Sequence, residues 1–154
     1  MDFGSYELLL VIHLITVVVG IGGVVLNGVY GAQAKQAGPN GGNAIVRANY
    51  AVSGIAEWFI YAIPVTGILM VLDDDYPWDF SDTWVWLSIV LYVIAVGNSH
   101  MNLKPSARRM IELTQGPPTP EVEAVGKKLG IAGTINDLIA VALIVLMVWK
   151  PGTF

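Results

Sequence analysis

The chain has 154 residues, of which 55% are hydrophobic and only 13% are charged, and its mean hydropathy is +0.63. Because an ordinary soluble domain carries charge on about a quarter of its residues, this composition excludes that class and indicates a polytopic membrane protein. There is no cysteine, which excludes a disulfide framework, a thiolate metal site and a cysteine-ligated iron–sulfur cluster.

The first apolar stretch has no charge between Glu7 and Lys35. A helix needs about 20 apolar residues to cross a bilayer, so we predict a membrane span over residues 6–31. The acidic opening MDFGSYE and the lack of a small-residue cleavage site predict that this helix is retained. At 100° per residue one face collects its polar and small residues. They are His13, Thr16, Val17, Gly20, Gly23, Val24, Asn27 and Gly31. An imidazole and a carboxamide need partners in hydrocarbon, so we expect this face to pack against other helices.

Three further apolar stretches complete the pattern. They predict spans over residues 50–72, 84–103 and 129–149. The sequence around Pro39 predicts a loop after the first span, and Pro64 predicts a kink near Ile60. Lys104 and Pro105 are expected to stop the third span, with a short helical extension after them. The fold class predicted for residues 1–154 is therefore all-α, a four-transmembrane-helix bundle in one domain.

Basic residues in short loops indicate the orientation of such a bundle. The first and third connections hold seven of the eight Lys and Arg, whereas the termini and the 73–82 loop hold seven acids and one Lys. We therefore predict a multi-pass protein of the cytoplasmic (inner) membrane, with both termini outside and the two basic connections in the cytoplasm. Five aromatic residues would form an outer belt: Tyr6, Trp78, Trp84, Trp86 and Trp149. Topology accounts for the basic residues, so nucleic acid is not an expected partner.

Several polar side chains share one depth, roughly 5 to 12 Å from the predicted cytoplasmic boundary at about 1.5 Å per residue. They are Asn27, Glu57, Asn98, His100, Asn136 and Asp137. An ionisable group inside a bilayer costs several kcal/mol unless it is paired, hydrated or neutralised. We predict a proton-handling or substrate-polarising site built on Glu57, Asp137 and Asn136, with His100 as the nearby cation. The alternative is structural, because amides and protonated acids, Asn27 and Asn98 among them, also join helices by hydrogen bonds.

The two histidines suggest a haem or metal site, because imidazole is the usual axial ligand of a b-type haem in a helical bundle. His13 lies roughly 10 Å below the outer boundary and His100 about 24 Å below it. A single haem b held by both is therefore not expected. Ligation by His13 alone, or separate roles for His13 and His100, fits the depths better.

Three short motifs resemble one known family. The run H-x-x-x-V-V-V-G at His13 is similar to the haem-binding first helix of HemJ-type membrane protoporphyrinogen oxidases. NSHMNLKPSARR at residues 98–109 and INDLIAVALIVLMVWKPG at 135–152 resemble that family's third and last helices. An uncharacterised four-helix membrane family, related to HemJ and to the copper-resistance CopD membrane domain, resembles the chain more closely. The resemblance implies a four-helix bundle that holds haem through His13, with Asn136 and Asp137 near the substrate or proton path.

Three functions follow as hypotheses. The first is a haem-binding protein with a redox or proton-handling role. The second is a non-catalytic accessory subunit that packs in the lipid with other membrane subunits or with copies of itself. The third is ion or proton passage, where copper is the weaker choice because the chain has no Cys and its Met residues do not gather on one face. Motifs of soluble enzymes such as G-x-S-x-G and H-E-x-x-H do not occur, and whether the protein is an enzyme stays open.

Overall fold

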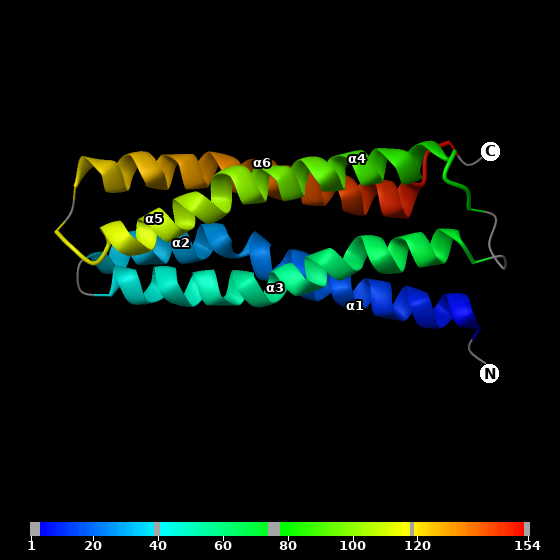
Figure 1. Cartoon of the computed structure of the whole chain (residues 1–154), viewed down its shortest axis with the longest axis horizontal. Coiled ribbons are helices and arrows are strands. Elements are labelled where there is room, and N and C mark those ends of the chain that lie inside the picture. The colour runs from blue at the N-terminus through cyan, green and yellow to red at the C-terminus, as the bar shows by residue number, and fades with distance from the viewer. Residues whose placement is uncertain (1–3, 39–40, 74–77, 118, 153–154) are drawn as a thin grey trace.

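The computed structural model describes residues 4–38, 41–73, 78–117 and 119–152, and these ranges contain helices and short connections without a strand (Figure 1). The predicted all-α class is confirmed. The helices are α1 (Ser5–Val25), α2 (Asn27–Ala37), α3 (Gly42–Val71), α4 (Thr83–Asn98), the π-helical turn η2 (Ser99–Leu103), α5 (Lys104–Leu113) and α6 (Pro120–Trp149).

The helices join into four rods, each long and apolar enough to cross a membrane. The rods are Ser5–Ala37, Gly42–Val71, Thr83–Leu113 and Pro120–Trp149. At about 1.5 Å per residue each exceeds the roughly 30 Å of hydrocarbon in a bilayer. The helices therefore continue past the predicted spans, and the loop expected around Pro39 is helical up to Ala37 and again from Gly42. Alanine, glutamine and lysine favour helix, which explains the extension before the glycines.

The two ends of the bundle differ in what they contain (Figure 1). Both chain termini and the connection between α3 and α4 lie at one end, here called the terminal end. The connections after α2 and after α5 lie at the other, here called the basic end. Its cations are Lys35, Arg47, Arg108, Arg109, Lys127 and Lys128.

Two helix pairs make up the bundle. The first rod packs along α3 and α4 packs along α6, while α5 contacts both α6 and α3 near the basic end. The predicted inward face of α1 is confirmed, because His13, Thr16 and Gly20 are buried. A methyl group at Gly20 would lie 3.1 Å from the backbone nitrogen of Ile60, so this glycine sets how closely α1 approaches α3.

The third rod bends at η2, directly before Pro105. Proline has no N–H, and its ring clashes with the carbonyl four residues earlier. The helix widens there, and the Lys104 N–H donates to the carbonyl of Ser99. The predicted stop at Lys104 and Pro105 is therefore wrong, because the helix widens there instead of ending. The short helical extension predicted after it is confirmed as α5, which runs to Leu113.

Pro64 lies inside α3, which stays α-helical through it. The carbonyl of Ile60 loses its usual N–H donor and instead accepts a hydrogen bond from the Tyr92 hydroxyl of α4, at 3.3 Å. A neighbouring helix thus satisfies the carbonyl that proline leaves free.

Aromatic side chains gather at the terminal end. Trp78 Nε1 donates to the Tyr6 hydroxyl at 3.4 Å, and the Trp78 and Trp84 rings meet edge to face at 5.6 Å. The Lys150 ammonium lies 3.8 Å from the centre of the Trp78 ring. These contacts tie the α3–α4 connection to both ends of the chain.

Candidate functional site

Three polar contacts join α3 to the η2–α5 segment and follow one another along the two antiparallel helices. We call them the polar ladder. The pairs are Tyr61–His100, Glu57–Lys104 and Tyr50–Arg108. The Tyr61 hydroxyl lies 2.9 Å from His100 Nε2, Lys104 Nζ donates to Glu57 Oε1 at 2.5 Å, and Arg108 Nε donates to the Tyr50 hydroxyl at 2.8 Å.

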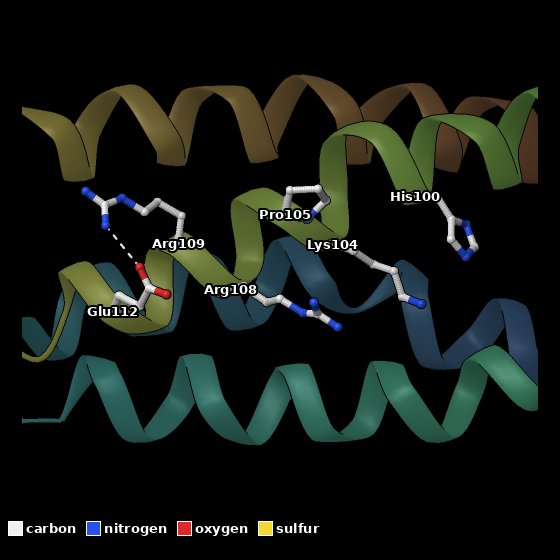
Figure 2. Close-up of a pocket in the computed structure, with 6 residues that line it drawn as sticks. All are labelled: His100, Lys104, Pro105, Arg108, Arg109 and Glu112. Carbon is white, nitrogen blue, oxygen red and sulfur yellow. Dashed lines mark hydrogen bonds and ion pairs between the residues drawn. The ribbon is translucent and has the colours of Figure 1, made fainter.

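Helical spacing explains why these residues meet. His100, Lys104 and Arg108 are four residues apart, so they project from one side of the η2–α5 segment, as Figure 2 shows. On α3 the ladder residues share one face at spacings of seven and four. The contacts of Tyr61 with Glu57 and of Tyr50 with Arg108 agree with this shared face.

Glu57 is the centre of the ladder. Its Oε1 accepts from the Lys104 ammonium and also contacts the Tyr61 hydroxyl, and His100 Nε2 lies 3.5 Å away. The side chains of Glu57 and Lys104 are 22% and 33% exposed. Lys104 therefore supplies the counter-charge that makes a carboxylate tolerable at this depth.

The contacts of His100 indicate which of its ring nitrogens carry a proton. Its Nδ1 lies 3.0 Å from the carbonyl oxygen of Val96. A carbonyl accepts and cannot donate, so Nδ1 carries a proton. The other ring nitrogen, Nε2, faces the Tyr61 hydroxyl, whose single hydrogen must serve both Nε2 and Glu57.

Two proton arrangements satisfy these contacts. If Tyr61 donates to a Glu57 carboxylate, Nε2 must carry its own proton and His100 is an imidazolium. If Tyr61 donates to Nε2, Glu57 must be protonated and donates to Tyr61. The two arrangements have the same net charge and interconvert when protons shift across the phenol. The Glu57–Tyr61–His100 chain can therefore hold one additional proton at either end.

A second polar group, the amide cluster, lies between α4 and α6. Asn98 Nδ2 donates to Asn136 Oδ1 at 2.8 Å and to the carbonyl of Ala132 at 2.9 Å, and Asn102 donates to Asn98 at 3.0 Å. Asn136 also donates to the carbonyl of Ala95 at 3.3 Å. These contacts satisfy amides with amides and backbone, which is the structural alternative expected for asparagine.

The remaining predicted residues lie apart from the ladder. Asn27 accepts from Ser53 at 3.1 Å, which joins α2 to α3. Asp137 is half-buried on α6, and within the described ranges no hydrogen bond or ion pair links it to Glu57 or to any other residue. The single meeting point expected from depth is therefore divided among different helix interfaces.

Comparison with protein families gives a match over most of the chain. Residues 7–151 match the family described as predicted integral membrane protein (DUF2269). The chain belongs to this family. The family description covers membrane location and no activity, and it does not support a relationship to HemJ-type oxidases or to the CopD membrane domain. Comparison with curated proteins and with solved structures gives no match.

His13 occupies a closed site between α1 and α3 of this family member. Thr66 donates its hydroxyl to the carbonyls of Ala62 and Ile63, so its oxygen accepts from His13 Nδ1, 2.8 Å away. His13 is 7% exposed, and a methyl group at Gly67 would lie 3.4 Å from its ring carbon Cε1. This enclosure leaves no open face for a porphyrin. The two nitrogens of His100 already contact Val96 and Tyr61. Neither histidine site fits haem in this arrangement, and haem b stays an untested prediction.

The sequence reasoning missed Lys104 and Arg108 as site residues, because it placed Lys104 at the end of the third span and Arg108 in a separate extension beyond it. Their spacing of four and eight residues from His100 was the available signal. For Arg108 this spacing identifies a shared face only if the helix passes Pro105, which the widening at η2 permits.

An open pocket of about 480 Å³ lies beside the ladder and is lined by residues of η2 and α5 (Figure 2). Its lining residues are His100, Lys104, Pro105, Arg108, Arg109 and Glu112. Arg109 is ion-paired with Glu112 at 3.0 Å and with Glu121 at 2.9 Å. The cavity is therefore a basic pocket at the edge of the polar ladder.

Proposed function

We propose that this integral membrane protein binds and transfers protons in the half of the bilayer next to its basic end, through Glu57, Tyr61 and His100. The observation that carries the proposal is the continuous chain of contacts from Glu57 through the Tyr61 hydroxyl to His100 Nε2. Lys104 keeps the carboxylate available, and the Val96 carbonyl fixes the proton on His100 Nδ1. A phenol between an acid and an imidazole is suited to relay protons.

The exposure of the ladder supports this role over a purely structural one. The His100 side chain is 45% exposed although it lies in a membrane rod. A structural polar contact is favoured when both partners are enclosed, whereas proton exchange requires a route to water. In the proposed role Tyr50 and Arg108 extend the ladder from Glu57 toward the basic end, where protons would exchange with water.

Infrared difference spectra recorded during a pH titration of the purified protein test the proposal. We expect a protonated-carboxyl band that disappears in Glu57→Gln. In Tyr61→Phe the carboxyl and imidazole signals should change independently of each other with pH, because the hydroxyl between the two groups is gone. Glu123→Gln, an exposed carboxyl on α6, is the control and should keep both signals. A carboxyl band that survives Glu57→Gln, or unbroken coupling in Tyr61→Phe, would overturn the proposal.

We also propose that the basic end faces the cytoplasm, since its excess of Lys and Arg agrees with the positive-inside rule. The chain has no cysteine, so single cysteines can report the orientation without background. An impermeant maleimide applied to intact cells should label Ser81→Cys at the terminal end. It should label Gly116→Cys only after the membrane is opened. The reverse pattern would reverse the orientation.

An accessory subunit is the second candidate, and Asp137 favours it. This half-buried carboxyl has no partner within the described chain, and methyl groups at Gly130 and Gly133 on the same helix face would meet open space. A second chain could approach α6 there and pair the carboxyl. Native mass spectrometry should then show an assembly that Asp137→Leu dissociates. A wild-type protein that is monomeric and extracted without other subunits would exclude this candidate.

A further inference from the structure

Arg108 differs from the other cations of the basic pocket in its partners. Lys104 is paired with Glu57, and Arg109 is paired with Glu112 and Glu121. Within the described ranges Arg108 has no carboxylate at ion-pair distance, and its Nε donates to the Tyr50 hydroxyl. The two terminal nitrogens of its guanidinium group therefore remain available to an anion.

The Tyr50 contact also orients this guanidinium group. The hydrogen bond of 2.8 Å holds Arg108 Nε toward α3, and Lys104 lies one turn away, about 6 Å along the helix axis. Figure 2 shows the side chains of Lys104 and Arg108 extending the same way from α5. The planar guanidinium group of Arg108, next to the Lys104 ammonium, suits the oxygens of a phosphate group.

The surroundings of the pocket indicate what bears the phosphate. Lys104 and Arg108 directly follow the uncharged stretch 83–103, so they lie where the apolar part of the rod meets the headgroup region. On the same rod, Met101 lies three residues and Val93 eleven residues before Lys104, and they are 77% and 61% exposed. A cationic pocket at the end of a rod with exposed apolar residues matches a molecule with an anionic head and a hydrocarbon tail.

We propose that the basic pocket binds the phosphate of an anionic membrane lipid, with Arg108 as the main contact and Lys104 as the second. The acyl chains lie along the outer surface of α4. Anionic headgroups collect beside clusters of Lys and Arg at a membrane surface, and the basic end provides such a cluster. Lipid binding does not depend on the proposed proton transfer, because Tyr61 takes no part in it.

Native mass spectrometry of the detergent-solubilised protein tests the proposal, with dioleoylphosphatidylglycerol and dioleoylphosphatidylcholine as the lipids. We expect the wild type to bind the anionic lipid, with Arg108→Gln binding it about tenfold more weakly, the effect of losing a charge-assisted hydrogen bond. Arg47→Gln is the matched control. It removes the same charge from an exposed position at the same end and does not line the pocket, so binding should change less than about twofold.

Glu57→Gln supplies a test of opposite sign. Removing the carboxylate frees the Lys104 ammonium from its ion pair with Glu57, so its contact with the lipid phosphate becomes stronger. Retention of phosphatidylglycerol should increase in Glu57→Gln, whereas Tyr61→Phe should leave it unchanged. A Tyr61→Phe variant that loses the infrared coupling but keeps the lipid separates the two proposals experimentally.

Inorganic phosphate distinguishes a lipid site from a site for the free anion. Millimolar phosphate should not displace phosphatidylglycerol, because the acyl chains contribute to binding. Displacement by phosphate, equal binding of the two lipids, or equal binding by Arg108→Gln and Arg47→Gln would overturn the proposal. Thermal unfolding of Arg108→Gln should match that of Arg47→Gln, since both side chains are exposed, so a folding defect would not imitate the expected result.

Discussion

The two histidines of the chain lie in different halves of the bundle and differ in their surroundings. In the terminal half His13 is 7% exposed and lies against Thr66, whose hydroxyl is satisfied by backbone carbonyls. In the basic half the His100 side chain is 45% exposed and belongs to an ionic contact chain with Tyr61 and Glu57. His13 is thus enclosed among uncharged groups in the terminal half, whereas His100 is partly exposed and lies next to charged groups in the basic half.

This difference indicates which half of the bundle contributes to stability and which half is suited to chemistry. An enclosed hydrogen bond between packed helices adds to stability, because its loss leaves a buried polar group unpaired. Where water reaches a partly exposed ion pair, the pair adds less to stability, because solvation competes with it. The ladder residues are therefore poorly explained by stability, and substitutions in the two halves should have different consequences.

Gly20 gives the largest expected effect. Leucine at this position would force α1 away from the Ile60 backbone, which lies 3.1 Å from the position of the first added carbon. We expect Gly20→Leu to lower the free energy of unfolding by about 3 kcal/mol or more. Reversible unfolding in mixed micelles measures this change.

Gly22 is the matched control for that substitution. It is two residues away on the same helix, and a methyl group there would meet open space. Gly22→Leu should change stability by less than about 0.5 kcal/mol. Equal losses for the two variants would mean that α1 does not pack on α3 through this face and would break the contrast between the halves.

The fold was largely predictable, because apolar runs and helix periodicity are local properties. The inward face of α1 came from the spacing of His13, Thr16 and Gly20, and all three are buried. The ends of the helices were harder to predict, because hydropathy marks where a helix is apolar and not where it stops. A proline usually marks the end of a helix, but before Pro105 the helix widens at η2 and then continues.

The candidate site was only half predictable. Depth along a helix can be counted from the sequence, and it placed Glu57, Asn136 and Asp137 at one level. Direction around the bundle depends on which helices are neighbours, which the short loops do not specify. Glu57 faces α5, whereas Asn136 faces α4. The partner of Glu57, Lys104, could be identified only once the helix was known to continue past Leu103.

His13 and Thr66 provide the next effect in size. His13→Leu or Thr66→Val removes one partner of an enclosed hydrogen bond, and each should cost about 1–3 kcal/mol of unfolding free energy. The double variant should recover part of the loss, with a coupling of roughly 0.5–1.5 kcal/mol as found between membrane helices. The same cycle on Tyr50→Phe and Arg108→Gln should give a smaller coupling, because that contact is exposed. A larger coupling at Tyr50–Arg108 would reverse the comparison.

Asp79 gives the smallest expected effect, at the connection that closes the terminal end. Its Oδ1 accepts from the Ser81 N–H at 2.7 Å, and this backbone hydrogen bond holds the pKa of Asp79 below its usual value of 3.8. Because the folded protein prefers the charged form, Asp79 stabilises the fold above pH 3.8, and the contribution is lost as the pH falls through the lowered pKa.

The melting temperatures of wild type and Asp79→Asn, compared from about pH 6 down to about pH 3, follow this contribution. The difference between them should shrink on the acid side, because the Asn side chain does not titrate. Ser81→Ala keeps the backbone N–H and should retain most of the pH dependence. A difference that stays constant over this range would show that the Asp79 carboxylate does not stabilise the connection.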